Sequence, residues 1–103
     1  PPGPPPSAGR FELAQPSPNP ARGSVQALYT VPSSSAGAPF EVAVYDVVGR
    51  RVQSLERGSA RAGRFTATWN LRTADGTPVG EGLYFLRVTL GSLVQSRKVA
   101  VVR

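Results

Sequence analysis

Short runs of alternating apolar and polar residues, separated by glycine-containing turns, restrict this chain to β structure. In Val25–Val31, the residues Val25, Ala27, Tyr29 and Val31 share one side of an extended segment. Because a strand sends successive side chains to opposite faces, this period of two predicts strands with one buried face. No window of the sequence has the apolar period of a helix.

Seven runs are predicted as strands. They are Phe11–Ala14, Val25–Val31, Phe40–Val48, Arg51–Glu56, Arg64–Asn70, Leu83–Leu90 and Leu93–Val102. Two connections, Gly49-Arg50 and Gly91-Ser92, place glycine first in a two-residue loop, which predicts type II′ hairpins between antiparallel neighbours. Short antiparallel strands without helices predict an all-β sandwich.

Proline marks the boundary of the folded part. Eight of the 11 prolines lie in the first 20 residues of this 103-residue chain, and a segment of that kind lacks the N–H groups that a helix or sheet needs. Residues 1–10 are predicted to be a Pro-rich linker with polyproline II spacing, and residues 11–103 one domain. The absence of methionine and of a signal-peptide pattern predicts that the chain belongs to a longer protein.

The positive charge has two interpretations. Lys and Arg number 12 against 6 Asp and Glu, giving a net charge of +6, and Lys98 is the one lysine. Clustered arginines bind phosphate and carboxylate groups, so an anionic partner such as lipopolysaccharide, acidic glycan or nucleic acid is one interpretation. The arginines are scattered from Arg10 to Arg103, which favours an ordinary solvated surface and predicts no specific nucleic-acid partner.

The residue types that carry catalysis are scarce. The chain has no cysteine and no histidine, which excludes thiol nucleophiles, disulfides and zinc–thiolate sites. Glu41 and Asp46 lie five apart on one predicted strand, so alternation directs them to opposite faces. Asp75-Gly76 with Glu81 has the oxygen ligands that calcium binds, but Asp-Gly is also a standard turn pair, and a turn is favoured. The chain is therefore predicted to be no enzyme and to hold no cofactor.

The aromatic residues divide between core and surface. Trp69 and Tyr84 are in phase with apolar neighbours and are predicted to be buried, with Tyr29 or Tyr84 close to Trp69. Tyr45 is out of phase with Val42 and Val44, so it either lies on the other face of its sheet or is the exposed ring. An exposed set of such rings would suit sugar stacking, which is the alternative to core packing.

A series of motifs then gives the chain a family resemblance. The motifs are Phe11-x-Leu13, Pro18-Asn19-Pro20, Val31-Pro32, VYDVVGRRV at 44–52, Ala62-Gly63 leading to Trp69, Gly82-Leu83-Tyr84-Phe85 and a terminal SRKVAVVR. In this order they resemble the C-terminal sorting domains of type IX secretion substrates, and they are similar to the immunoglobulin-like domain of flagellar hook-capping proteins. The resemblance covers residues 11–103.

This resemblance implies a fold and a function. The fold is a seven-stranded antiparallel immunoglobulin-like β-sandwich, placed last in a secreted or cell-surface bacterial protein whose other parts precede the linker. The implied partners are the outer-membrane secretion translocon and the processing and anchoring machinery; anionic surface polysaccharide is a further expected partner. An assembly module like that of the hook cap, or a glycan-binding module of an extracellular protein, remains the alternative.

Five residues match the motifs of that family and are the candidate recognition residues. They are Asp46, Gly49, Gly82, Tyr84 and Lys98. Each also has a structural interpretation: Asp46 would bond the turn amides, Tyr84 would form a tyrosine corner, and Lys98 would protect a sheet edge.

The predicted last strand has an inward and an outward side, and the sequence differs from the family motifs at two places. Val99 and Val101 are expected to face inward, while Gln95, Arg97 and Lys98 offer polar surface contacts. Ala21 stands where the family usually has an aromatic residue after Pro-Asn-Pro. Leu71-Arg72 stands where the family commonly has an Asp/Asn-Gly turn.

Overall fold

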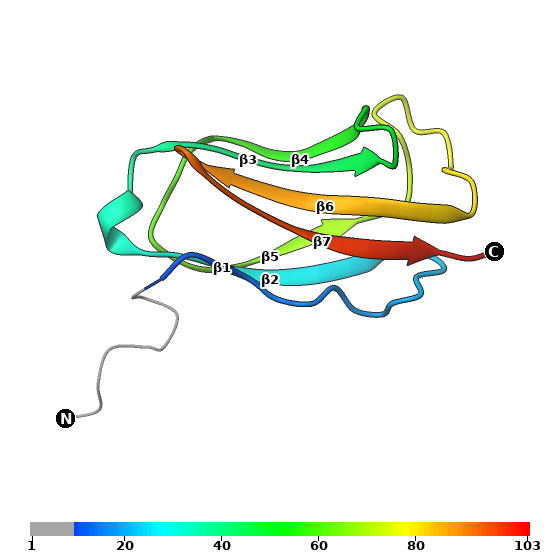
Figure 1. Cartoon of the computed structure of the whole chain (residues 1–103), viewed down its shortest axis with the longest axis horizontal. Coiled ribbons are helices and arrows are strands. Elements are labelled where there is room, and N and C mark those ends of the chain that lie inside the picture. The colour runs from blue at the N-terminus through cyan, green and yellow to red at the C-terminus, as the bar shows by residue number, and fades with distance from the viewer. Residues whose placement is uncertain (1–9) are drawn as a thin grey trace.

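Seven strands form two antiparallel sheets that pack face to face in a computed structural model, which describes residues 10–103 (Figure 1). The strands are β1 (Glu12–Leu13), β2 (Val25–Val31), β3 (Pro39–Asp46), β4 (Arg51–Ser59), β5 (Gly63–Trp69), β6 (Gly82–Leu90) and β7 (Leu93–Val101). One sheet has the order β1-β2-β5 and the other β4-β3-β6-β7. The predicted all-β sandwich of seven antiparallel strands is confirmed.

Little else in the described part of the chain is regular. One 3-10 turn, Ser33–Ser35, follows β2. Within residues 10–103 no helix has the length and apolar character needed to cross a membrane. Apart from Arg10, the predicted Pro-rich linker at residues 1–10 lies outside the described residues.

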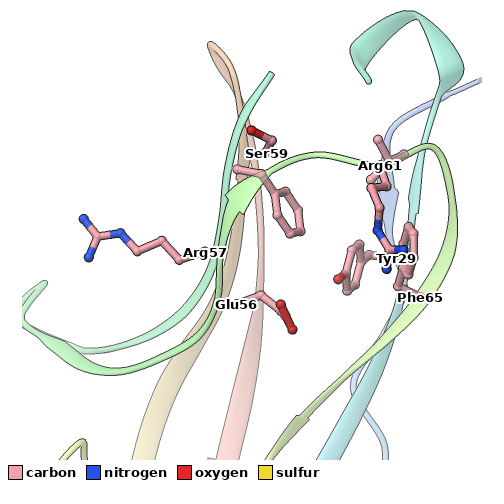
Figure 2. A pocket seen from close by; sticks show the side chains of 8 residues that line it. Tyr29, Glu56, Arg57, Ser59, Arg61 and Phe65 are labelled. Carbon is pink, nitrogen blue, oxygen red and sulfur yellow. The ribbon is translucent and has the colours of Figure 1, made fainter. Parts of the chain in front are cut away.

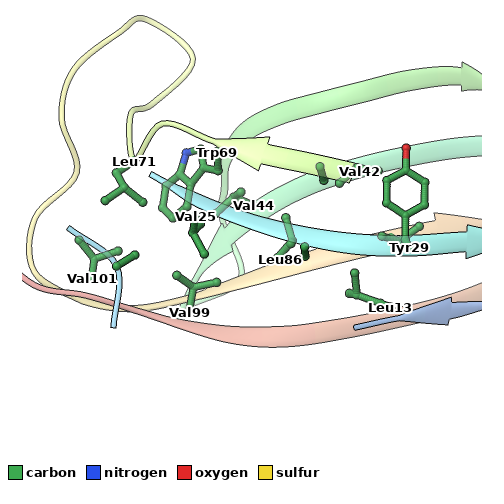
Figure 3. Packing of buried hydrophobic residues seen from close by; sticks show 14 of the residues in the cluster. Leu13, Val25, Tyr29, Val42, Val44, Trp69, Leu71, Leu86, Val99 and Val101 are labelled. Carbon is green, nitrogen blue, oxygen red and sulfur yellow. The ribbon is translucent and has the colours of Figure 1, made fainter. Parts of the chain in front are cut away.

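The buried faces of the strands are those that alternation predicts, and they meet between the sheets (Figure 3). Trp69 is 1% exposed, and its ring lies 5.3 Å from that of Tyr84 in an edge-on arrangement. Phe40, Phe65 and Tyr84 are partly buried and pack against this core from its margins. Burial of a ring the size of Trp69 contributes more to stability than most other core side chains, because the contribution grows with apolar area.

One predicted hairpin is confirmed in detail. Leu90 pairs with Leu93, which leaves Gly91 and Ser92 as a two-residue loop. Gly91 has a φ of +61° and Ser92 a negative φ, which is the combination of a type II′ turn. β4 is longer than predicted and ends at Ser59, because β3 pairs with it as far back as Pro39.

The segment after β1 closes one side of the sandwich. Ala21 donates its N–H to the carbonyl of Ala100 at 2.7 Å and accepts the N–H of Val102 at 2.9 Å, as a parallel neighbour of β7. Beside it, the Asn19 side chain donates to the carbonyl of Lys98 and accepts the N–H of Ala100, both at 2.9 Å. Ala21 is fully buried at this contact with β7.

Gln95 and Arg97 do not lie on the outer surface as expected. Both are in phase with the buried Val99 and reach β1 instead. Gln95 accepts the N–H of Leu13 at 2.8 Å and donates to the carbonyl of Phe11 at 2.9 Å, and Arg97 donates to the carbonyl of Leu13 at 2.9 Å. The physical reason is that partly buried backbone groups of the short β1 need hydrogen-bond partners, and these side chains supply them.

Candidate functional site

The turn between β3 and β4 and the start of β6 lie side by side at one end of the sandwich. Asp46, the last residue of β3, pairs with Tyr84 near the start of β6. Between them and the loop that precedes β6 runs a shallow groove. Its lining includes Asp46, Val47, Val48, Arg50, Thr73, Pro78, Val79, Gly80, Glu81, Gly82, Leu83 and Tyr84. Three of the five candidate residues therefore line one groove.

Asp46 holds the β3–β4 turn in shape. Its Oδ1 accepts the backbone N–H groups of Val48 at 3.1 Å and Arg50 at 2.9 Å, and its Oδ2 accepts Nε of Arg50 at 2.9 Å. The hydrogen bond from the Arg50 N–H, followed by the Arg50 side chain and its charge, holds the pKa of Asp46 below its ordinary value. The structural role expected of Asp46 is thus present.

The hairpin predicted at Gly49-Arg50 is wrong in its length. The loop runs from Val47 to Arg50, closed by a hydrogen bond from the N–H of Gly49 to the carbonyl of Asp46 at 3.0 Å. Gly49 has a φ of +87° and follows the two central residues instead of opening the turn. Because the Asp46 carboxylate satisfies two loop amides, the longer loop is preferred to a two-residue one.

The longer loop exposes two apolar residues. Val47 and Val48, predicted as strand, are 65% and 70% exposed in the loop, and Leu83 beside them is 47% exposed. An Asp followed three residues later by Gly is the signal that identifies such a loop, and the sequence contains it. The groove therefore has an apolar rim as well as charged groups at Asp46, Arg50 and Glu81.

Tyr84 ties the loop before β6 to the sandwich. Its hydroxyl donates to the carbonyl of Gly80 at 2.8 Å, four residues upstream, while its ring contacts Trp69. This is the geometry of a tyrosine corner. Gly82 between them has a φ of +149°, a backbone conformation that side chains disfavour, which explains a glycine at this position.

Lys98 lies on another surface. It is exposed on β7, directly opposite Phe85 of β6, and faces outward from the four-stranded sheet as alternation predicts. The carbonyl of Lys98 is bound by Asn19, so the strand edge at this point is covered by the N-terminal segment.

The carboxylates of Glu41 and Asp75 are held in separate local contacts. Glu41 is bound by Arg51 and Ser54 at 3.2 Å each, and lies apart from the Asp46 turn. Asp75 accepts hydrogen bonds from the Thr73 hydroxyl and the Thr77 N–H, and the first of these is the main reason that its pKa is lowered. Within residues 10–103 no three His, Cys, Asp or Glu side chains converge.

A second hollow lies toward the opposite end, between β4 and β5 (Figure 2). Tyr29 forms its centre, with ring centroids of Phe40 and Phe65 at 5.6 and 5.5 Å. The Arg61 guanidinium lies 5.6 Å from the Phe65 centroid. Burial raises the pKa of Tyr29; the Glu56 carboxylate adds to this and Arg61 opposes it. The rings come from three strands, so no local pattern marked this hollow.

Comparison with known proteins identifies the family of this domain. A family model named FlgD Ig-like domain matches residues 17–92, most of the chain. The chain belongs to the FlgD Ig-like domain family. FlgD Ig-like domains are non-catalytic modules. No curated protein matches this FlgD Ig-like domain.

Two solved structures from Porphyromonas gingivalis share the fold of this FlgD Ig-like domain. Dimeric latent PorU aligns over 90% of the chain with 23% identity and a TM-score of 0.66. PorZ, an essential bacterial surface component of the type IX secretion system, aligns over 90% with 24% identity and a TM-score of 0.50. The alignments span 9% of the PorU chain and 11% of the PorZ chain.

Proposed function

We propose that residues 11–103 form a non-catalytic sorting module that directs a larger protein through type IX secretion to the cell surface. The observation that carries the proposal is the likeness in fold, over 90% of the chain, to PorU and to PorZ. Since PorZ is a surface component of the type IX system, the same module in another protein suits the same machinery. Its partners would be the outer-membrane translocon and the processing and anchoring enzymes.

The groove is the part of the domain best suited to recognition. A translocon that selects folded proteins needs a surface of constant shape, and the hydrogen bonds of Asp46 and Tyr84 hold both walls of the groove. Val47, Val48 and Leu83 supply exposed apolar contacts at its rim. Lys98 would add a polar contact on β7 outside the groove.

A reporter fusion tests the proposal. A signal peptide and a fluorescent protein are placed before residues 1–103 in a host with a working type IX system and in a translocon-deficient strain. The reporter should reach the surface in the first strain and remain periplasmic in the second. Deleting residues 98–103 should abolish export together with folding, because it removes the backbone groups of β7 that bind Asn19 and Ala21.

Surface variants separate recognition from folding. Val48→Ser should lower export without unfolding the domain, since exposed substitutions usually change stability by less than about 0.5 kcal/mol. Leu28→Ser is the matched control, because Leu28 is similarly exposed at 57% but lies on β2 of the other sheet. Lys98→Ala should change stability by less than about 1 kcal/mol.

An assembly module is the second candidate, favoured by the match to the FlgD Ig-like domain. If the folded fusion stays periplasmic in both strains, the sorting function is wrong and this candidate replaces it. An ordered oligomer of residues 1–103 in sedimentation experiments would then support assembly.

A further inference from the structure

The outward face of the four-stranded sheet carries aromatic and basic side chains in one row. The strands β3, β6 and β7 are neighbours in this sheet (Figure 1). Tyr45 of β3 pairs with Phe85 of β6, and Phe85 pairs with Lys98 of β7. The core-facing neighbours Val44 and Leu86 are buried, so these three residues point to the other side. With Arg87, also on the outward side of β6, they form what we call the outer patch.

Arg87 confirms the geometry of the outer patch. Its guanidinium carbon lies 4.2 Å from the centroid of the Tyr45 ring, so the two side chains stack on the same outward face. Stacking on a ring fixes the plane of a guanidinium and leaves N–H groups at its periphery for a ligand. Ala43, opposite Arg87, is only 1% exposed, which shows how closely the side chains cover this part of the sheet.

The charge of the outer patch is uncompensated. β6 and β7 contain no Asp or Glu. The ion pairs found within residues 10–103 are Arg10–Glu12, Arg50–Asp46 and Arg51–Glu41, so Arg87 and Lys98 take part in none of them. Asp46, which follows Tyr45 on β3, is paired with Arg50, and Glu41, on the outward side of β3, is bound by Arg51 and Ser54. Two cations therefore flank two rings with no counter-charge.

These features fit one class of ligand. We propose that the outer patch binds a polysaccharide that contains uronic acids. The apolar face of a sugar ring stacks on an aromatic side chain, and its carboxylate matches the paired N–H groups of an arginine. Tyr45 and Phe85 lie on adjacent strands, about 4.8 Å apart, a separation comparable to one sugar unit. The preference for a polysaccharide over nucleic acid rests on the surface location proposed above.

Nuclear magnetic resonance tests whether the outer patch binds such a polysaccharide. Polygalacturonate fragments are titrated into residues 1–103, and the shifts of the backbone amide signals are followed. Shifts should concentrate on β3, β6 and β7. The double variant Arg87→Gln/Lys98→Gln should weaken binding about tenfold, since each exposed ion pair contributes up to about 1 kcal/mol. Arg64→Gln is the matched control: Arg64 is exposed on β5 of the other sheet and should change affinity less than about twofold.

Further variants and ligands make the outcome decisive. Tyr45→Leu should weaken binding of polygalacturonate more than that of polyglutamate, which has the charge without the sugar ring, because only the former loses a stacking contact as well as the support that the ring gives to Arg87. Equal or tighter binding of polyglutamate, or of single-stranded DNA, would overturn the proposal in favour of another anionic partner. No binding of polygalacturonate would also overturn it. If the double variant is unstable, Lys98→Gln alone, at an exposed position, replaces it in the test. The binding measurements do not depend on the export assay.

Discussion

Gln95 binds the backbone of Leu13 as a neighbouring strand would. Its side-chain oxygen accepts the Leu13 N–H at 2.8 Å, and its amide nitrogen donates to the carbonyl of Phe11 at 2.9 Å. Asn19 makes the reciprocal arrangement, with its side chain on the backbone of Lys98 and Ala100. Gln95 thus joins β7 to β1, whose backbones do not pair, and Asn19 joins the segment after β1 to β7 beside the backbone hydrogen bonds of Ala21.

Replacing Gln95 by Leu should therefore destabilise the domain by about 1–3 kcal/mol, because partly buried groups of β1 lose their partners. Urea unfolding measures the change. Gln26→Leu is the matched control: the Gln26 side chain is exposed on β2, and its loss should change stability by less than about 0.5 kcal/mol. Equal effects of the two substitutions would contradict a bridging role for Gln95.

Local patterns predicted the strands but not the contacts that join distant segments. Alternation correctly predicts that Val99 faces inward. The same rule directs Gln95 inward, but the polarity of its side chain favoured a surface position. The hydrogen bond of Gln95 to Leu13 spans 82 residues, and no local pattern contains its partner. The same holds for the outer patch, since only the register of β3, β6 and β7 brings Tyr45, Phe85 and Lys98 into one row.

The local roles of Asp46 and Tyr84 were easier to predict than the groove they line, because their hydrogen bonds are short in sequence. Asp46 binds amides two and four residues ahead, and Tyr84 binds a carbonyl four residues behind. Such contacts follow from residue types at fixed spacing. The pairing of Asp46 with Tyr84, which assembles the two into one groove, depends on the sheet and could not be read from either motif.

The tyrosine corner gives a second stability prediction. Tyr84→Phe removes the hydroxyl that binds the Gly80 carbonyl and keeps the ring against Trp69, so it should cost about 0.5–1.5 kcal/mol. Tyr45→Phe is the control, since the Tyr45 ring stacks with Arg87 on the outer face and its hydroxyl makes no comparable bond within residues 10–103. Thermal unfolding of both variants distinguishes the loss of the tyrosine-corner hydrogen bond from the loss of a tyrosine hydroxyl elsewhere.

Acid should weaken the domain partly through Asp46. Its pKa in the folded state lies below the value of about 3.9 expected in the unfolded chain. The carboxylate therefore stabilises the fold at pH values above about 4, and this contribution is lost as pH falls through the lower, folded pKa. In Asp46→Asn the loss of stability over that acid range should be smaller than in the wild type, as measured by urea midpoints at a series of pH values. Unchanged acid sensitivity would show that the turn bonds do not depend on the charge.

Leu71 combines a strained backbone with a buried side chain, and the two effects can be separated. Its φ is +60°, a conformation that costs an L-residue about 1–2 kcal/mol and that glycine adopts freely. Its side chain is 2% exposed in the core, close to Trp69 in Figure 3, and its carbonyl accepts the N–H of Val79. Burial of the Leu71 side chain thus offsets the strain of its backbone.

Two substitutions at Leu71 test that balance. Leu71→Ala should cost about 2–5 kcal/mol, because it removes the buried side chain and keeps the strain. Leu71→Gly loses the same contacts but relieves the backbone, so it should be no less stable than the alanine variant. At Leu86, buried on β6 with ordinary strand geometry, glycine should instead be less stable than alanine by about 0.5–1 kcal/mol. If glycine is worse than alanine by the same margin at both positions, the backbone of Leu71 carries no strain, and burial alone explains the leucine in this turn.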